Sequence, residues 1–280
     1  GGVWLSVDGG NNWTPRSDGL YGYEIYHGSA SITRNDLISI GTQDNGELFH
    51  NGNTWYCNRG GDWSSKEAFD WIPGGSSVYY FGNAKRRALL GGGEVSLGLP
   101  RSSYRDIGFY KNMPELAFVG DSEIYRTTNL SASTPTWTQI SALAKPVLAV
   151  HICPTDSNIL YAICNDQRFY VCNNALSASP TFTSYALPSS VSSTSTIAGL
   201  RGNKNVIYIA INNKVYRSSD GGATWVNKTA NLPSVNYVQI LIDQSYPANE
   251  LVFVGGGSGS LYYKKAGDTN WTLFTSLLPS

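Results

Sequence analysis

The stretch Val215-Tyr-Arg-Ser-Ser-Asp-Gly-Gly-Ala-Thr-Trp225 decides the fold, because it encodes two short extended segments joined by a tight turn. Its first three residues favour a strand. Asp220 can accept hydrogen bonds from backbone N–H groups a few residues further on, and the two glycines after it supply the positive φ that such a turn needs. Trp225 gives the returning segment a large apolar anchor. The stretch therefore predicts a β-hairpin.

A second copy of this hairpin stands near the start of the chain, as Leu5-Ser-Val-Asp-Gly-Gly-Asn-Asn-Trp13. The shared pattern Ser-x-Asp-x-Gly-x-x-Trp resembles the Asp-box of the sialidase-type, or BNR, repeat family. The resemblance implies an all-β repeat protein that carries the motif on the outer hairpins of its repeats. Six residues then have a structural role in these hairpins: Asp8, Gly10, Trp13, Asp220, Gly222 and Trp225.

Related hairpins recur roughly every 40–47 residues, the period expected of propeller blades. Between them lie pairs of apolar extended segments, such as 146–152 with 159–164. Each repeat therefore predicts four antiparallel strands, and a blade of this kind is stable only when it packs against its neighbours. The predicted fold class is an all-β propeller of four-stranded antiparallel blades, at 21–58, 62–105, 106–141, 145–187, 194–230 and 235–276.

The same alignment predicts the number of blades. Six blades are complete, and the hairpin Val3–Arg16 is the outer half of a seventh, whose inner half does not precede it. Residues 1–280 then form a single domain with six and a half blades of a seven-bladed propeller. We expect this domain to be a fragment of a longer parent chain, which would supply the rest of the ring. A six-bladed ring with Val3–Arg16 as an added edge is the alternative.

The charge and hydropathy of the chain narrow the class of partner. Its 280 residues include 20 basic and 20 acidic side chains, so the formal net charge is zero. A neutral chain lacks the excess of basic residues that dominates binding to nucleic acid. No apolar run reaches the ~18–20 residues that a membrane-spanning helix needs. We therefore expect neither a nucleic-acid partner nor membrane insertion.

A second resemblance rests on Gly41-Thr-Gln-Asp-Asn-Gly46, which is followed after Trp55 by Arg59-Gly-Gly-Asp62. This pairing is similar to a signature of large secreted bacterial propellers, especially of the Bacteroidetes type, often described as BNR-repeat or glycosyl-hydrolase-like proteins. Trp63 stands where that signature usually has glycine. The resemblance implies a propeller in a secreted or cell-surface protein, and it indicates no particular activity.

The polar residues of this signature are the candidate ligand-binding residues. They are expected on loops next to inner strands, and such loops converge on one face of a propeller around its axis. Carboxylate and amide oxygens together suit a hard cation such as Ca²⁺, which is the one cofactor considered. Turn capping and hydrogen bonds between blades are the alternative role. The candidates are Gln43, Asp44, Asn45, Asp62 and the aromatic Trp63 beside them.

No catalytic group can be assembled from the spacing of residues. Sialidases need three convergent arginines and a tyrosine nucleophile, and their early Arg-Ile-Pro motif is absent. A glycosidase needs two carboxylates beside the sugar, and xyloglucan-active endoglucanases with similar Asp-boxes place one catalytic Asp on each of two propellers. The predicted function is a non-catalytic binding or scaffold module that recognises a glycan or a protein at its central face. The alternative is part of a glycoside hydrolase that needs a second domain.

The four cysteines do not match the spacing of a zinc site. Cys153 and Cys164 lie in neighbouring apolar segments, and Cys172 follows shortly after. Buried free thiols are the first interpretation, and a disulfide between 153 and 164 or between 164 and 172 is the second. His151 stands in an apolar segment, which favours a core residue over a metal ligand.

Overall fold

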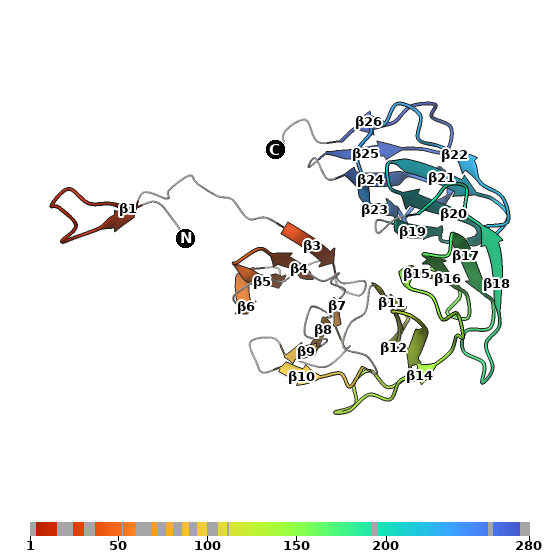
Figure 1. Cartoon of the computed structure of the whole chain (residues 1–280), viewed down its shortest axis with the longest axis horizontal. Coiled ribbons are helices and arrows are strands. Elements are labelled where there is room, and N and C mark those ends of the chain that lie inside the picture. Colours follow the sequence, from red (N-terminus) through yellow and green to blue (C-terminus); the bar gives the residue numbers. More distant parts are fainter. Residues whose placement is uncertain are drawn as a thin grey trace.

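The computed structural model describes residues 4–15, 25–30, 37–51, 53–59, 69–71, 77–80, 86–89, 94–99, 106–110, 112–191, 195–256 and 260–274. Within these ranges the chain forms six four-stranded sheets and one two-stranded sheet, and all strand pairs are antiparallel. The four-stranded sheets surround a common centre (Figure 1). The chain is an all-β propeller with four-stranded antiparallel blades, as predicted. The closed ring of seven blades stays a prediction.

The strands of the four-stranded sheets follow the predicted blades, except that β6 ends at Arg59, one residue beyond the blade predicted at 21–58. The first two sheets consist of β3 (Ile25–Ala30), β4 (Leu37–Thr42), β5 (Gly46–Asn51), β6 (Trp55–Arg59), β7 (Phe69–Trp71), β8 (Ser77–Tyr80), β9 (Arg86–Leu89) and β10 (Glu94–Ser96). The third and fourth consist of β11 (Asp106–Tyr110), β12 (Met113–Gly120), β13 (Ile124–Thr127), β14 (Thr138–Gln139), β15 (Val147–Ile152), β16 (Leu160–Cys164), β17 (Arg168–Cys172) and β18 (Phe182–Ala186).

The fifth and sixth sheets consist of β19 (Ser195–Leu200), β20 (Asn203–Ile211), β21 (Lys214–Ser218), β22 (Val226–Asn227), β23 (Tyr237–Ile242), β24 (Val252–Gly256), β25 (Leu261–Lys264) and β26 (Thr272–Leu273). A short 3₁₀ helix, η1 (Pro247–Asn249), lies between β23 and β24. In the described part of the chain, no helix has the length and apolar character needed to cross a membrane.

The first strand of each of the last four sheets lies nearest the centre. Figure 1 shows β11, β15, β19 and β23 on the inner side of their sheets, and each contacts the next one in this order. The middle strands behind them are apolar on both faces. In β20, Ile207 and Ile209 pack against the fourth sheet, whereas Tyr208 and Ala210 pack against the sixth. Because alternate side chains of a strand point to opposite faces, a continuous apolar run is what a blade between two neighbours requires.

The inner strands are edge strands of their sheets, so some of their N–H groups point away from the ladder. Side chains of the preceding sheet accept hydrogen bonds from two of these N–H groups. Asp106 Oδ2 accepts the N–H of Val150 at 2.8 Å, and His151 Nε2 accepts the N–H of Gly199 at 3.0 Å. These bonds join β11 to β15 and β15 to β19. Packing around the centre is therefore fixed by specific polar contacts as well as by apolar burial.

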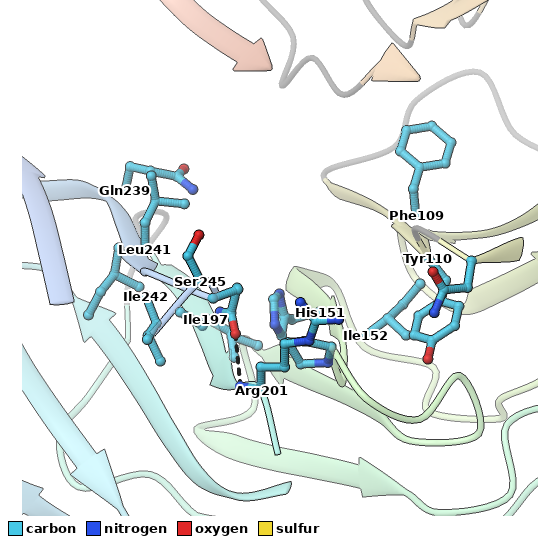
Figure 2. A pocket seen from close by; sticks show the side chains of 15 residues that line it. Phe109, Tyr110, His151, Ile152, Ile197, Arg201, Gln239, Leu241, Ile242 and Ser245 are labelled. Atoms are coloured by element: carbon cyan, nitrogen blue, oxygen red, sulfur yellow. Dashed lines mark hydrogen bonds between the residues drawn. The ribbon is translucent and has the colours of Figure 1, made fainter. Parts of the chain in front are cut away.

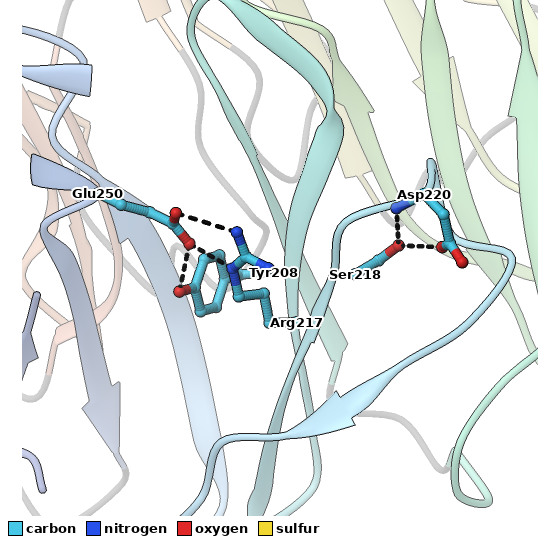
Figure 3. A network of polar contacts seen from close by, with 5 residues as sticks. All are labelled: Tyr208, Arg217, Ser218, Asp220 and Glu250. Carbon is cyan, nitrogen blue, oxygen red and sulfur yellow. Dashed lines mark hydrogen bonds and ion pairs between the residues drawn. The ribbon is translucent and has the colours of Figure 1, made fainter. Parts of the chain in front are cut away.

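The outer hairpin of the fifth sheet is closed by hydrogen bonds around Asp220. Its Oδ1 accepts the Ser218 hydroxyl at 2.8 Å and the Thr224 N–H at 2.9 Å, and its Oδ2 accepts the Thr224 hydroxyl at 2.6 Å. Ser218 Oγ in turn accepts the N–H of Gly222 at 2.8 Å. Figure 3 shows the Ser218–Asp220 part of this arrangement. The serine and the aspartate together hold the turn.

The two-stranded sheet near the start of the chain, β1 (Trp4–Leu5) with β2 (Thr14–Pro15), has a turn of the same design. Asp8 accepts the Ser6 hydroxyl at 2.9 Å, the Asn12 N–H at 2.9 Å and the Asn12 side-chain amide at 2.6 Å. Ser6 Oγ accepts the N–H of Gly10 at 2.7 Å. The φ of Gly10 is 94°, close to the 98° of Gly222. Figure 1 shows this hairpin apart from the four-stranded sheets.

Asparagine replaces the aspartate in the third and fourth sheets, whose hairpins have longer tips. Asn129 Oδ1 accepts the Thr127 hydroxyl and the Thr136 N–H, each at 2.9 Å. Asn174 Oδ1 accepts the Cys172 thiol at 3.3 Å and a turn N–H at 2.9 Å. Cys172 thus occupies the place of the hairpin serine. One turn design therefore serves four hairpins with different sequences.

Candidate functional site

A pocket of about 460 Å³ lies at the centre of the last four sheets. The inner strands β11, β15, β19 and β23 form its walls, together with the turns that follow them. Figure 2 shows Phe109 on one side and Gln239 on the other. The pocket has the size of a small-ligand or side-chain site. Its lining includes Phe109, Tyr110, Asn112, His151, Ile152, Ile197, Arg201, Gln239, Leu241 and Ser245.

The lining combines an apolar wall with polar groups at the turns. Ile197 and Ile240 are buried strand residues, whereas Leu241 is 54% exposed. Asn112, Arg201 and Ser245 lie on first-to-second-strand turns and are exposed. An exposed apolar side chain next to convergent polar groups is typical of a binding site in a rigid scaffold. The described lining contains no Asp or Glu.

Arg201 is held by its backbone on the turn between β19 and β20. Gln244, on the following sheet, accepts the Arg201 N–H with Oε1 at 2.8 Å and donates from Nε2 to the Gly199 carbonyl at 3.0 Å. The N–H of Gly199 is bound to His151 on the preceding sheet. The turn that presents Arg201 is therefore fixed from both sides. Arg201 itself is exposed.

His151 is a neutral hydrogen-bond acceptor at the edge of the pocket. Its Nε2 accepts the Gly199 N–H, so the proton of the neutral ring is on Nδ1. Burial lowers the pKa of His151 to about 4. The ring stacks on Tyr161, with 6.4 Å between the ring centroids. The interpretation of His151 as a packed structural residue is thus supported by its contacts, although the same ring also lines the pocket.

The residues predicted from the Gly41–Gly46 signature lie elsewhere. Gln43, Asp44 and Asn45 form the tight turn between β4 and β5, the second and third strands of their sheet. In an antiparallel sheet this turn is at the end opposite to the first-to-second-strand turns, which line the pocket in later sheets. Asp62 and Trp63 lie outside the described residues. The turn of Gln43, Asp44 and Asn45 is therefore separate from the pocket.

Local hydrogen bonds account for part of the polarity of that turn. The backbone carbonyl of Gln43 accepts both the N–H and the side-chain amide of Asn45, at 2.7 and 3.0 Å. Asp44 has a φ of 59°, which aspartate and asparagine tolerate better than most residues. The described residues contain no group of three or more His, Cys, Asp or Glu side chains arranged to hold a metal ion. A ligand or calcium role for Gln43, Asp44, Asn45 and Asp62 stays a prediction.

The side chains of the two Ser-x-Asp-x-Gly-x-x-Trp hairpins make contacts within and between blades. Hydrogen bonds from Thr224 and Ser218 hold the pKa of Asp220 at about 2, and bonds from Asn12 and Ser6 lower the pKa of Asp8. Trp225 packs edge-on against Phe169 of the preceding sheet, with ring centroids 5.1 Å apart. These contacts stabilise the two hairpins and, at Trp225, the packing of the fifth sheet on the fourth.

A buried polar network also joins the fifth and sixth sheets (Figure 3). Glu250 accepts the Tyr208 hydroxyl at 2.6 Å and pairs with Arg217 through both carboxylate oxygens. Burial alone would raise the pKa of Glu250, but the bonds from Arg217 and Tyr208 outweigh it and lower that pKa. All three side chains are engaged with one another. The network is therefore a link between blades.

The pocket was not predicted from the sequence, because its lining comes from four blades that are separated along the chain. One signal was available. Arg201 directly follows the apolar inner segment Ser195–Leu200, at a position where a turn residue faces the axis. Comparing the residue at this position in every repeat could have identified it.

The comparisons with known proteins agree with the fold. The structure described as YCF48 bound to D1 peptide has a TM-score of 0.59 and 16% identity, over 95% of this chain and 86% of that chain. YCF48 from Cyanidioschyzon merolae has a TM-score of 0.62 and 14% identity, over 90% and 84%. At these identities the likeness shows the fold alone.

A third solved structure, described as an ancestral GH74 enzyme, has a TM-score of 0.51 and 15% identity, and the match covers 98% of this chain but 32% of that chain. None of the functionally curated proteins matches the sequence. The family model described as the DUF6242 beta propeller domain matches residues 113–277, more than half of the chain. This chain therefore belongs to the DUF6242 beta-propeller domain family.

Proposed function

We propose that this chain is a non-catalytic propeller module that binds a partner at its central pocket, as part of a secreted or cell-surface protein. One observation carries the proposal. The pocket combines apolar strand residues with exposed polar groups on fixed turns, and its described lining offers no carboxylate. Glycoside hydrolysis needs two carboxylates beside the sugar, so the pocket suits recognition better than hydrolysis.

A protein partner fits this pocket better than a glycan. Ile197, Leu241 and Phe109 all line the pocket, and their apolar side chains suit a hydrophobic side chain of a partner. The YCF48 structure, similar in fold, is described as bound to a peptide, which supports a peptide-sized ligand for a propeller of this kind. A glycan stays the second candidate, because Phe109 and Tyr110 could stack on a sugar ring.

The ring itself is part of the proposal. The matching hydrogen bonds around Asp8 and Asp220 support assigning both hairpins to the Asp-box repeat. Elsewhere the hairpin tryptophan binds the preceding sheet, since Trp137 Nε1 donates to the Leu97 carbonyl at 2.8 Å and Trp271 Nε1 to the Lys228 carbonyl at 2.7 Å. Trp13, by contrast, is 59% exposed, and its Nε1 donates to the Gly10 carbonyl of its own hairpin at 3.1 Å.

The last sheet has an unmatched surface of its own. Phe274 is 58% exposed, and its ring packs edge-on against Phe253 and Tyr263 on one face of this sheet. We assign the N-terminal hairpin to the outer half of a seventh blade that packs on this surface, within one domain of residues 1–280. Deleting residues 1–16 should then lower the melting temperature of the whole domain. An unchanged melting temperature would contradict this assignment.

Two binding assays test the proposed function. The first measures migration in native gels that contain soluble polysaccharides, followed by an assay for new reducing ends. The second measures binding to an array of random decapeptides. Gln239→Trp should fill the pocket and abolish binding, whereas Val226→Trp, at an exposed position on the outer strand β22, should not.

Three outcomes can be distinguished. Peptide binding that is blocked by Gln239→Trp supports the protein-binding module, and gel retardation blocked by the same change supports a glycan. New reducing ends would favour part of a glycoside hydrolase. Absence of binding in both assays would reject the proposed function.

A further inference from the structure

We propose that the central pocket recognises an apolar polypeptide segment through a carboxylate that pairs with Arg201. The inference rests on the binding function proposed above and names the ligand chemistry of the same site. It follows from the charge of the lining, the position of Arg201 and the apolar wall beside it.

The first step is the charge. Arg201 is the one residue in the described lining that is charged at neutral pH, because the lining includes no other Arg, no Lys and no Asp or Glu, and His151 is neutral. Within the described part of the chain, no hydrogen bond or ion pair involves the Arg201 guanidinium. Asp243, which is not part of the described lining, accepts the N–H of Ser245 at 2.8 Å with its carboxylate. The described lining therefore carries a positive formal charge, which favours an anionic ligand.

The second step is the geometry of the cation. The backbone of the Arg201 turn is fixed by Gln244 from one neighbouring sheet and by His151 from the other. A fixed turn presents the guanidinium with little loss of backbone freedom when a ligand binds. The planar guanidinium forms paired hydrogen bonds with a carboxylate, which a single-point cation cannot reproduce.

The third step is the apolar wall. Ile197 and Leu241 line the same pocket, and a volume of about 460 Å³ is enough for one large side chain with its backbone. The amides of Gln239 and Asn112 are exposed at the lining, where they can pair with peptide groups. This combination favours an apolar residue of a polypeptide. The carboxylate then comes either from the chain end or from an adjacent Asp or Glu.

Defined probes test the inference by calorimetric titration at pH 7. The free acid acetyl-Ala-Ala-Phe carries a terminal carboxylate, its amide carries none, and acetyl-Ala-Glu-Phe-amide carries a side-chain carboxylate. Sodium 3-phenylpropionate represents a free small acid. A hydrogen bond to a charged partner is stronger than one to a neutral partner, so at least one acid should bind about tenfold or more tightly than the neutral amide.

Arg201→Gln should remove this preference, and Arg201→Lys should keep part of it because the charge remains. Arg168→Gln is the matched control, since Arg168 is exposed on β17 and outside the described lining. The peptide acid with the higher affinity identifies the source of the carboxylate, whereas tightest binding of 3-phenylpropionate would reject a polypeptide ligand. Terminal, side-chain and free carboxylates are thus separated in one experiment.

Other results overturn the inference. Equal affinities for the acid and the amide would reject a role for the carboxylate in binding. If Gln239→Trp then blocked the binding of both peptides, the proposed binding function of the pocket would still stand. An acid preference that survives in Arg201→Gln would reject Arg201 as the partner. No binding of any probe would reject the ligand class, and the decapeptide array would then decide separately whether the pocket binds peptides at all.

Discussion

The ring of Phe169 occupies the space into which a side chain on Gly222 would extend. A Cβ added to Gly222 would lie 2.5 Å from Cδ1 of that ring. Phe169 belongs to β17 in the fourth sheet, and Gly222 belongs to the outer hairpin of the fifth. Gly222 also has a φ of 98°, which side chains rarely adopt. The glycine of the hairpin pattern therefore serves the turn and the contact between blades at once.

Gly222→Ala should destabilise the domain more than a turn glycine normally would. The substitution adds backbone strain to a collision with a buried ring, so we expect a loss of about 2–4 kcal/mol in the free energy of unfolding. Urea denaturation, monitored by tryptophan fluorescence, measures this change in the free energy of unfolding. Gly221→Ala is the control, because Gly221 also has a positive φ but its nearest neighbour is at 3.5 Å. A similar loss in both variants would show that the turn alone matters.

His151 should make stability depend on pH. Its pKa is about 4 in the folded protein and about 6.5 in an unfolded chain. Between these values the unfolded state binds a proton that the folded state does not, so stability falls as pH decreases from about 6.5 to 4 and is fully present above 6.5. The loss amounts to at most about 3 kcal/mol.

Urea denaturation at several pH values, with His151→Gln beside the unchanged protein, isolates this contribution. Glutamine can still accept the Gly199 N–H but does not titrate. The difference in unfolding free energy between the two proteins should therefore change with pH in this window. Parallel curves would show that His151 does not couple to folding.

Removing one member of the Glu250 network should destabilise the fold. Replacing all three polar members by apolar residues should destabilise it much less. Glu250→Ala leaves the Arg217 guanidinium and the Tyr208 hydroxyl without their acceptor, so we expect about 3 kcal/mol of destabilisation. Glu250→Leu combined with Arg217→Met and Tyr208→Phe should recover much of it, because no buried polar group is then left unpaired. A triple variant as unstable as Glu250→Ala would indicate that the network has a further role.

The blades could be predicted from the sequence, but the residues that line the pocket could not. Hairpins and apolar segments repeat with a regular period, and each depends on residues close together in the chain, so strand positions such as 159–164 followed from local pattern. The pocket depends on how neighbouring blades pack. Arg201 and His151 have different local surroundings in the sequence, and only the shared contact with Gly199 and its turn brings them together. The calcium prediction at Gln43, Asp44, Asn45 and Asp62 rests on the resemblance of a signature, and it stays a prediction.

The cysteines give a last prediction. All four are free thiols, with Cys57 exposed and Cys153, Cys164 and Cys172 buried. A 164–172 disulfide is excluded by the register of β16 with β17, in which Cys172 faces Leu160 and Cys164 faces Arg168. Four residues along a strand correspond to about 13 Å. This separation is well beyond the Cα distance that a disulfide allows.

The 153–164 pairing fails for the same reason. Cys153 follows Ile152, which faces Leu160, so it lies at the other end of β16 from Cys164. Burial raises the pKa of Cys164 to about 12, and Cys172 also has a raised pKa because of burial. Neither thiol should form the reactive thiolate at neutral pH while the protein is folded.

A thiol-reactive chromogenic disulfide such as Ellman's reagent should therefore titrate one thiol rapidly in the folded protein and all four after unfolding without reductant. Cys57→Ser should abolish the rapid phase and leave three slow thiols. Two thiols in the unfolded, unreduced protein would instead show a disulfide, and the strand register would then have to be revised. Because the slow phase requires opening of the sheets that hold Cys153, Cys164 and Cys172, its rate also measures how often these blades open.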